Sequence, residues 1–524
     1  MIKDDRGNGS TNSNVAFTKG FPEVDAMRGY PIVLTADRSM MSNYRNNYLF
    51  GFITCGPVEH IPEFVFKRLL APSVKVKGAG EVECAPYGLR KVEATLLQEY
   101  KENEVTVAHP DYVENFIGEN TKVVGISAMD PLGMGPVTSS FGSNTLTPYN
   151  RKKFRELMDR LKKNRYRHKY KVILGGSGAW QLAKREYRID YGIDHIIFGD
   201  IDGKTQEVFH KIVDGTAEEI ITLGSVKSID DIPTIRKPSL NALVEIMRGC
   251  GRGCTFCDPT TQKKLDIPLD RVMEEVKVNS RCFDFAALHS DDFLLYGCDN
   301  KDFYPNRDAI INLFSHVRRM EGISHISLTH CSLSPVALDS ELIEKISKIC
   351  KRKTDSWLGI QPGIETASPV LIKKHMPQKT KPFSPEEWPD VVRKAIKILN
   401  DNRWYVAATL IIGLPGEEDE DVEETLSLVE DLSESDCLLA PLLYVDYETD
   451  VQLTLNDLTV MQWELFYECW KHNCRQFNKW VWESNRGWNP LTRVIVSVLT
   501  RIGVKKILDT LEATDRDKLK PSTG

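Results

Sequence analysis

Three cysteines stand close together near the middle of the chain, within the stretch "MRGCGRGCTFCDPT" (247–260). Cys250, Cys254 and Cys257 are separated by three and then two residues, and glycines lie between them. Thiolates at this spacing could form half of a zinc site, one end of a disulfide framework, or an incomplete cage for an iron–sulfur cluster. In the last case, three thiolates would leave one iron of a four-iron cluster open to bind another molecule.

The other cysteines bear on these three alternatives. A structural zinc site normally needs a fourth ligand with paired spacing, and the chain has no second Cys-x₂-Cys pair. Twelve cysteines in 524 residues are too few for a disulfide scaffold. The nine cysteines outside the loop are expected to be small buried hydrophobes, and a second cluster at Cys469 and Cys474 stays an alternative.

Composition and length bound the class of protein. The chain is 41% hydrophobic and 27% charged, as soluble globular proteins are, and its net charge of −6 gives no reason to expect a nucleic-acid partner. The start, "MIKDDRGNGSTNSNVAF", has no apolar run of a signal peptide, and no stretch reaches the roughly 18 apolar residues of a membrane span. We therefore expect a cytoplasmic, reducing location, where clustered cysteines bind metal or catalyse more often than they form disulfides.

The first half of the chain predicts an α/β domain. Residues 1–28 are polar and predicted to be disordered, and short β-branched runs alternate with helical patterns over residues 29–224. The predicted strands are 31–36, 104–109, 122–127, 171–176 and 195–200, and the predicted helices are 87–100 and 150–164. This alternation predicts a doubly wound parallel sheet of flavodoxin or Rossmann type. The small-residue loops "SAMDPLGMGP" (127–136) and "GGSGAW" (175–180) would bring backbone close to a large planar or phosphate-bearing ligand.

A second α/β unit follows a polar linker at residues 225–240. The run "ALVEIMRG" (242–249) leads directly into the cysteine loop, and strand–helix alternation continues over residues 241–440. The further predicted strands are 283–289, 325–330, 357–365 and 405–416, with helices at 268–279, 306–320, 338–351, 385–401 and 419–432. The pattern predicts a full or partial (β/α) barrel, in which chemistry lies at the carboxyl ends of the strands. Residues 441–524 are predicted to be helical and are rich in tryptophan.

The pattern C-x₃-C-x-aromatic-C after the first strand of such a barrel resembles the radical S-adenosylmethionine (SAM) superfamily. Three later segments support the resemblance, because they stand in order at strand ends as that superfamily's SAM-binding motifs do: "HSDDFLLYG" (289–297), "GIETAS" (363–368) and "LIIGLPGE" (410–417). The resemblance implies a [4Fe-4S] cluster held by Cys250, Cys254 and Cys257, with Phe256 shielding it from water.

The same resemblance implies roles for the later segments. Asp291 and Asp292 replace the usual Gly-Gly-Glu motif that holds the amino group of SAM, although each could simply cap a helix. Glu365 would lie near the ribose or methionine moiety, and Gly413 and Gly416 along the adenine. The implied chemistry is reductive cleavage of SAM, with an electron from a ferredoxin- or flavodoxin-type donor. It gives a 5′-deoxyadenosyl radical that abstracts hydrogen from an unactivated carbon.

The first domain resembles the cobalamin-binding domain of the B12-dependent radical SAM group. This resemblance implies a bound cobalamin, with Gly175, Gly176 and Ser177 as contacts of its nucleotide tail. Cobalamin domains that ligate cobalt through histidine carry Asp-x-His-x-x-Gly after the first strand, and this chain lacks that motif. A cobalamin held here would therefore have no histidine ligand from it. The alternative is a flavodoxin-like domain that has lost cobalamin or binds the substrate.

Two reactions fit this superfamily. The stretches "YGLRKVEA", "AHPDYV" and "GISAMDPLGMGP" resemble archaeal GDGT ring synthases, which close cyclopentane rings in tetraether membrane lipids, so carbon–carbon bond formation is our first hypothesis. The Trp-rich region and the apolar helix at 491–508 fit a lipid substrate or peripheral membrane contact, although a packed helical core would explain the same tryptophans. Methyl transfer through cobalamin is the alternative, and a non-catalytic iron–sulfur or cobalamin sensor and a tRNA-modifying enzyme are further ones.

Overall fold

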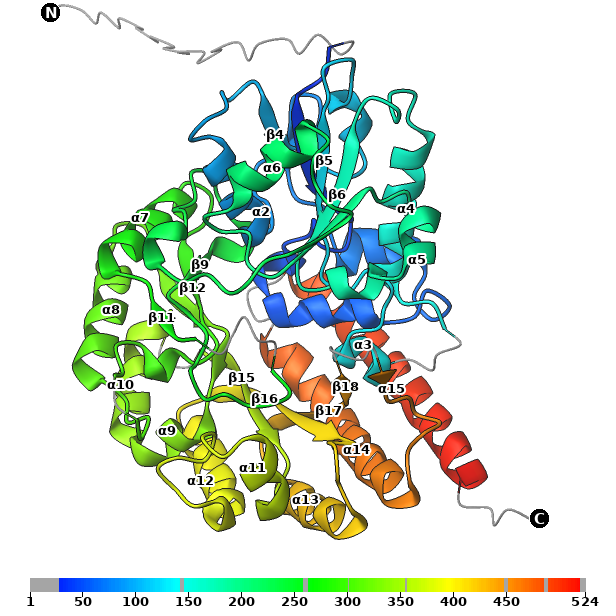
Figure 1. The fold of residues 1–524 in the computed structure, drawn as a ribbon. Helices are drawn as coiled ribbons and strands as arrows, with labels where there is room; N and C mark the ends of the chain where they lie inside the picture. Colours follow the sequence, from blue (N-terminus) through cyan, green and yellow to red (C-terminus); the bar gives the residue numbers. More distant parts are fainter. Residues whose placement is uncertain are drawn as a thin grey trace, which may run out of the picture.

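The structure is a computed structural model of the chain, and it describes residues 28–141, 146–257, 263–299, 301–353, 356–446, 451–484 and 489–518. This part is a mixed α/β structure with parallel sheets and a helical C-terminal region, as the sequence predicts (Figure 1). The N-terminal stretch predicted to be disordered lies, apart from Arg28, outside the described residues.

The first sheet has six parallel strands in the order β4-β1-β5-β6-β7-β8. Their bounds are β1 (Ile32–Ala36), β4 (Val105–Val107), β5 (Val123–Ser127), β6 (Lys171–Gly175), β7 (His195–Phe198) and β8 (Ile220–Thr222). Five coincide with predicted strands, whereas the sequence does not predict β8, which is only three residues long. The strand order reverses between β1 and β5, which is where ligand crevices of doubly wound sheets open.

Helices cover both faces of this sheet. They are α2 (Tyr87–Leu96) and α6 (Thr205–Val213) on one face, and α4 (Tyr149–Lys163) and α5 (Arg185–Tyr191) on the other. Ile32 and Leu34 of β1 pack with the first pair, whereas Val33 packs with the second. Alternate residues thus serve two separate cores, which explains why all five residues of the strand are buried and all but Thr35 are apolar.

Parallel strands in chain order form the second α/β part, as in a partial (β/α) barrel. One sheet has the order β13-β12-β9 and the next the order β14-β15-β16-β17. The strands are β9 (Leu243–Glu245), β12 (Phe285–His289), β13 (His325–Leu328), β14 (His330–Cys331), β15 (Leu358–Glu365), β16 (Trp404–Ile412) and β17 (Cys437–Leu443). The helices between them include α7 (Leu269–Asn279), α8 (Arg307–Arg319), α10 (Ser340–Cys350), α11 (Pro369–His375), α12 (Trp388–Asp401) and α13 (Asp419–Asp431). Only Thr329 separates β13 from β14, so one sheet leads directly into the next.

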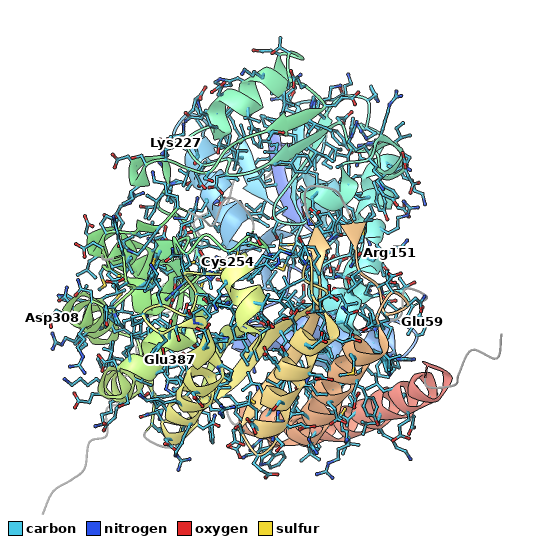
Figure 2. The ribbon with its side chains drawn as sticks, turned by 60° about the horizontal axis from the view of Figure 1, so that its bottom comes forward. Glu59, Arg151, Lys227, Cys254, Asp308 and Glu387 are labelled. Atoms are coloured by element: carbon cyan, nitrogen blue, oxygen red, sulfur yellow. The ribbon has the colours of Figure 1, made fainter. Side chains whose placement is uncertain are left out.

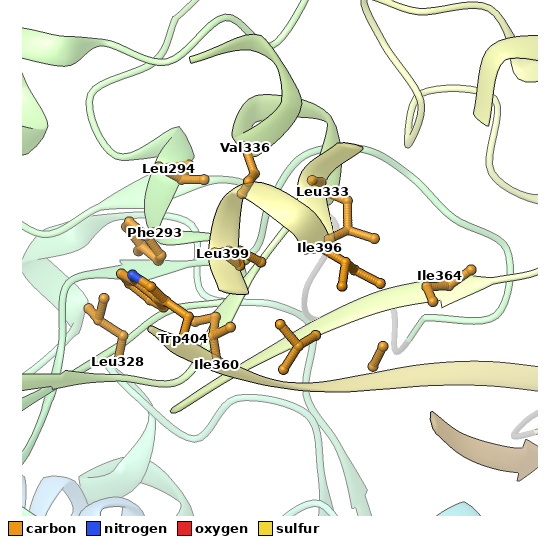
Figure 3. Packing of buried hydrophobic residues seen from close by; sticks show 14 of the residues in the cluster. Phe293, Leu294, Leu328, Leu333, Val336, Ile360, Ile364, Ile396, Leu399 and Trp404 are labelled. Carbon is orange, nitrogen blue, oxygen red and sulfur yellow. The ribbon is translucent and has the colours of Figure 1, made fainter. Parts of the chain in front are cut away.

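A large apolar core joins these strands to their helices (Figure 3). Trp404 at the start of β16 is fully buried and stacks on Phe293, with ring centroids 6.2 Å apart. Its Nε1 donates to Ser347 Oγ at 2.6 Å, so the polar edge of the indole is satisfied inside the core. Figure 3 shows Leu328 and Ile360 grouped around the same ring.

The C-terminal region consists of two long helices. α14 (Val460–Ser484) packs on β17 and α13, and α15 (Pro490–Lys518) packs on α14. Trp463, Trp470 and Trp480 are buried, so a packed helical core accounts for these tryptophans, which is the alternative to lipid contact. α15 nevertheless keeps an exposed apolar stripe formed by Leu491, Val494, Val498 and Ile502. Within the described residues, no helix combines the length and the apolar character needed to cross a membrane.

The segment predicted as a linker (225–240) packs between the two α/β parts. Lys91 Nζ of α2 donates to Pro233 O at 2.5 Å and to Glu275 Oε1 at 2.6 Å. Tyr87 OH, also on α2, donates to Glu275 Oε2 at 2.6 Å. Because Glu275 belongs to α7, these bonds fix a helix of the first part to a helix of the second.

A second connection starts at the cysteine loop itself. Arg248, on β10 (Met247–Arg248), donates from Nε to Glu245 Oε1 at 2.8 Å and from Nη1 to Asp202 Oδ2 at 2.7 Å. Asp202 belongs to the loop after β7, so the residue two positions before Cys250 is held by both α/β parts.

Candidate active site

The three predicted cluster ligands lie in a loop directly after β10. Gly249, Gly251 and Gly253 all have positive φ (67°, 75° and 67°), a backbone region that residues with a side chain avoid. Glycine at alternate positions therefore allows this tight path between the cysteines. Cys254 is only 5% exposed, and Figure 2 places it near the middle of the molecule, away from Asp308 and Glu387 at the edge.

Two of the thiols are direct neighbours. The Cys257 thiol donates a hydrogen bond to Cys254, which lowers the pKa of Cys254 to about 7 and raises that of Cys257. Burial raises the pKa of Cys250. Among the described residues, no three His, Cys, Asp or Glu side chains are arranged to hold a single metal ion. A four-iron cluster does not need such convergence, because each thiolate binds a different iron.

His375 ties the cysteine loop to two other segments. Thr255 N donates to His375 O at 2.9 Å, and Thr255 Oγ1 lies 2.9 Å from His375 Nδ1. His375 Nε2 lies 2.9 Å from Pro415 O, which can only accept, so Nε2 carries the proton. One buried imidazole therefore connects the loop, α11 and the predicted adenine segment. The sequence gives no signal for this role.

The two neighbouring aspartates, Asp291 and Asp292, have different hydrogen-bond partners in the structure. Asp291 Oδ2 accepts from Gly249 N at 2.6 Å and so holds the start of the loop. Asp292 is fully buried, and its Oδ1 accepts from Leu294 N at 3.2 Å while Oδ2 has no hydrogen-bond partner among the described residues.

A buried arginine faces the free oxygen of Asp292. Arg252 is 3% exposed, and its Nε and Nη2 also lack hydrogen-bond partners in the described part. Arg252 Nη2 lies 3.7 Å from Asp292 Oδ2. Buried donors and acceptors are normally satisfied, so these atoms suit a polar ligand that enters beside the cysteine loop. A carboxylate next to a guanidinium matches the ammonium and carboxylate of an amino acid.

Glu365 lies at the end of β15, again with positive φ (67°). Thr409 Oγ1 donates to its Oε2 at 3.0 Å, and Lys379 Nζ donates to its Oε1 at 2.6 Å. The same Nζ lies 5.9 Å from the ring centroid of Phe256, which is partly buried against the barrel core. The predicted shielding aromatic and the predicted SAM-binding carboxylate thus meet at a lysine that the sequence motifs do not include.

The glycines of the segment 413–417 are closely surrounded. Gly413 and Gly416 have φ of 85° and 82°, and a Cβ on Gly416 would lie 2.3 Å from Lys374 Nζ. Gly413 N donates to Glu417 Oε2 at 2.7 Å, and Gln462 Nε2 donates to the same oxygen at 2.8 Å. Glu417 thereby holds the segment against α14, and its burial raises its pKa to about 7.

The raised pKa of Glu417 predicts a pH-dependent stability. Its ordinary pKa is 4.5, so between pH 4.5 and about 7 the unfolded chain releases a proton that the folded chain keeps. The resulting stabilisation is complete below pH 4.5 and is lost as the pH rises through about 7. We expect Glu417→Gln to raise the unfolding free energy by roughly 1 kcal/mol at pH 8 and to change it little at pH 4.5. Denaturant unfolding at both values checks this, with the exposed Glu420→Gln as control; a larger gain at the lower pH would contradict it.

The predicted cobalamin-tail residues lie at the end of β6. Gly176 has φ of 97°, and a Cβ there would lie 2.5 Å from Ala128 O. A Cβ on Gly178 would lie 2.3 Å from Met129 O. These glycines therefore let the loops after β5 and β6 approach each other, which explains them without a ligand. Gly175 has no comparable close neighbour, and Ser177 is exposed.

Two aspartates that the sequence reading passed over stand at the switch point of this sheet. Asp130 accepts from Gly135 N, Gln181 Nε2 and Asn150 Nδ2 at 2.6–2.8 Å, so it holds the loop after β5 in shape. Asp37 directly follows β1, is 3% exposed, and has its pKa raised to about 6 by burial. The sequence does offer one indication of Asp37, since it is an acidic residue immediately after the first predicted strand.

Histidines mark the interior of the barrel. His289 at the end of β12 has Nδ1 3.1 Å from Thr329 Oγ1, and its ring centroid lies 5.9 Å from that of His330. Burial lowers the pKa of His330 to about 4, and its Nδ1 has no hydrogen-bond partner in the described part. A neutral His330 imidazole therefore stands beside His289 at the strand ends. His289 belongs to a predicted motif, but the sequence predicts no role for it.

Residues 244–429 match the sequence model of the Radical SAM superfamily. One curated relative is the tRNA-2-methylthio-N(6)-dimethylallyladenosine synthase of Clostridium botulinum, 30% identical over 207 residues, which cover 39% of this chain and 42% of that protein. The enzyme of the same name from Thermotoga petrophila is 25% identical over 285 residues, or 53% of this chain and 59% of that protein. The chain thus spans less than two thirds of the length of these relatives.

Solved structures match a larger part of the chain. The radical SAM methyltransferase TsrM from Kitasatospora setae, with cobalamin and a [4Fe-4S] cluster bound, has a TM-score of 0.50 and 13% identity over 79% of this chain and 72% of that one. A second TsrM structure, with tryptophan and a SAM analogue, has a TM-score of 0.51 and 14% identity. At this identity the likeness concerns the fold, whereas the sequence match identifies the part that carries the cysteine loop and the SAM motifs. Residues 244–429 therefore form a radical SAM superfamily domain.

Proposed function

We propose that this chain is a cobalamin-dependent radical SAM methyltransferase. The observation that carries the proposal is a pair of buried groups beside the cysteine loop of a radical SAM domain, Asp292 Oδ2 and Arg252 Nε and Nη2. They face each other at 3.7 Å but have no hydrogen-bond partner among the described residues. When bound, the [4Fe-4S] cluster and SAM supply one-electron chemistry, and cobalamin supplies a methyl carrier. Cys250, Cys254 and Cys257 would hold the cluster.

The chain's own residues would orient SAM. Asp292 would accept from its ammonium group and Arg252 would donate to its carboxylate, which satisfies the orphaned atoms of both. Glu365 would accept from ribose hydroxyls, and the tight backbone of residues 413–417 would lie along the adenine. Phe256 would keep water from the cluster, and a one-electron donor of ferredoxin or flavodoxin type would supply the electron.

The arrangement of the first domain supports a cobalamin facing the barrel. Its switch point carries the loop 127–136, and Gln452 Nε2, beyond β17, donates to Met134 O of that loop at 2.9 Å. A ligand between β1 and β5 would therefore lie at the barrel's later strands. Asp37 and Ser39, which follow β1 at this point, are buried. The sequence lacks the Asp-x-His-x-x-Gly motif, so no histidine of that kind would reach the cobalt.

Ring closure in membrane lipids is the second candidate. The exposed stripe on α15, with Arg493 and Arg501 on a half of the helix free of acidic residues, favours it, because such a face suits the surface of an anionic bilayer. The burial of Trp463, Trp470 and Trp480 on α14 weakens one of its three sequence arguments, the Trp-rich region, although Trp482 is exposed. On this proposal the protein is cytoplasmic with peripheral membrane contact and takes an apolar substrate.

One experiment separates the candidates by the products of SAM. The chain is reconstituted anaerobically with iron, sulfide and cobalamin, reduced, and given SAM with extracts of its host. Methyl transfer from SAM leaves S-adenosylhomocysteine and adds fourteen mass units to a product, as expected here. Ring closure leaves 5′-deoxyadenosine and methionine, removes two mass units per ring and leaves no S-adenosylhomocysteine. If neither S-adenosylhomocysteine nor 5′-deoxyadenosine is formed, both candidates are refuted and the sensor is favoured. A labelled methyl group recovered in tRNA would favour the RNA-modifying alternative.

A further inference from the structure

Lys379 places a buried positive charge beside the cysteine loop. Its side chain is 11% exposed, and Nζ lies 2.6 Å from Glu365 Oε1. Nζ also lies 5.9 Å from the ring centroid of Phe256, the residue before Cys257. A lysine is rarely buried without a partner, so its position between a carboxylate and the cluster loop calls for an explanation.

The surroundings fix the place of this ammonium group. Lys379 O accepts from Arg252 Nη1 and from Ser334 Oγ, each at 3.1 Å, and Lys379 N donates to Met376 O at 2.9 Å. On the side-chain end, a Cβ on Gly363 would lie 2.5 Å from Nζ, so the glycine leaves the space that the ammonium occupies. Both ends of the residue are therefore held.

The ammonium interacts with the thiols as well as with Glu365. Burial opposes its charge, but Glu365 first, and then Cys254 and Cys257, raise the pKa of Lys379 overall. Because Nζ lies 5.9 Å from the ring centroid of Phe256, directly before Cys257, the charge stands beside the loop that carries the thiols. A positive charge that stabilises thiolates also stabilises an electron added to a cluster that these thiolates hold.

We propose that Lys379 is a positioning residue that raises the reduction potential of the cluster, and that Glu365 offsets part of this effect. The inference rests on the proposed function, because it requires a [4Fe-4S] cluster at the three cysteines. In the step concerned, the ferredoxin- or flavodoxin-type donor loses one electron and the cluster gains it, with no bond made or broken. Lys379 and Glu365 would then set how readily the donor can reduce the cluster before SAM is cleaved.

The test is a redox titration of the reconstituted full chain without SAM, followed by EPR of the reduced cluster. At the potential where the wild type is half reduced, we expect Lys379→Met to lower the ratio of reduced to oxidised cluster about tenfold, which is 59 mV for one electron. Lys379→Arg keeps the charge and is expected to stay within about twofold of the wild type. Glu365→Gln should raise the ratio. Lys373→Met, which removes a lysine of α11 whose side chain is 59% exposed, is the matched control and should leave the ratio unchanged.

Three results would overturn the inference. They are a wild-type ratio in Lys379→Met, an equal loss in Lys373→Met, and a change in the same direction in Lys379→Met and Glu365→Gln. If Lys379→Met does not bind a cluster, the test rests on Glu365→Gln and Lys379→Arg. An unchanged or lowered ratio of reduced to oxidised cluster in Glu365→Gln then refutes the proposal. A wild-type chain that binds no four-iron cluster would instead refute the proposed function, which keeps the two failures apart.

Discussion

Replacing Cys254 by alanine is expected to abolish cluster binding and all turnover of SAM. Cys254 is the most buried of the three loop cysteines, and its pKa of about 7 makes it the thiol most easily ionised among them. A four-iron cluster that loses one of only three protein ligands is left with two open irons, so we expect iron and sulfide content to fall to background. Iron analysis and EPR of the anaerobically reconstituted protein measure the effect.

The matched control for this prediction is Cys282→Ala. Cys282 is exposed and lies outside the loop, so its removal should leave iron content and SAM cleavage at wild-type levels. The result that contradicts the assignment is a Cys254→Ala protein that still binds about four irons. A wild-type iron content in the Cys254→Ala protein would mean that the three cysteines pack as small hydrophobic residues and do not bind a cluster.

The largest expected effect on stability comes from Trp404→Ala. The indole is fully buried, stacks on Phe293, and bonds Ser347 through Nε1 (Figure 3). Its truncation leaves a large cavity and removes the hydrogen bond that Ser347 Oγ accepts, although this hydroxyl still donates to Ile343 O. We therefore expect a loss of ~3–5 kcal/mol in the free energy of unfolding. For a part of this size that corresponds to a fall of about 10 °C in the melting temperature. Denaturant and thermal unfolding, both followed by circular dichroism, measure the change.

Phe64→Ala serves as the comparison for the core substitution. The side chain of Phe64 is 68% exposed, so its loss should change the free energy of unfolding by no more than ~0.5 kcal/mol. Equal losses for Trp404→Ala and Phe64→Ala would show that burial does not determine the effect, against the packing described here. Iron content should stay near wild type in both proteins at low temperature, since neither residue lies in the cysteine loop.

The sequence predicts those parts of the site that combine a motif with a strand end. The cysteine loop, Asp292, Glu365 and the segment 413–417 all follow apolar runs that form strands, so periodicity places them at one end of a barrel. The two adjacent aspartates differ in the structure, because Asp291 Oδ2 accepts from Gly249 N whereas Asp292 Oδ2 has no hydrogen-bond partner in the described part. Two adjacent acidic residues look equivalent in a sequence, and only the backbone direction decides which one points to a ligand.

The positions of Lys379 and His375 beside the cysteine loop could not be predicted from the sequence. Lys379 follows Glu365 by fourteen residues in an irregular segment, and no periodicity relates its side chain to the motif. His375 ends a helix, where a basic residue is ordinary. The tryptophans of α14 are ambiguous in the opposite way, because aromatic residues suit a packed core and a lipid surface equally well by type alone, and in the structure three are buried while Trp482 is exposed. Glycines such as Gly176 suited a ligand in the same way, yet each lies against neighbouring backbone.

The bonds of Arg248 and Glu275 have a consequence for how this architecture can be recombined. Cofactor-binding modules are attractive to exchange when each has its own core, and here the main cores of the two α/β parts are separate. A smaller apolar cluster nevertheless joins Tyr149 of α4 to Tyr405 of β16. Yet Arg248 is shared between Asp202 and Glu245, and Glu275 is shared between Tyr87 and Lys91. If the barrel were fused to a different partner domain, Arg248 would lose Asp202, and Glu275 would lose Tyr87 and Lys91. Both charged groups would then lack these partners at the interface that leads into the cysteine loop. A working chimaera would have to cut inside the first domain and carry α2 and the loop after β7 along with the barrel.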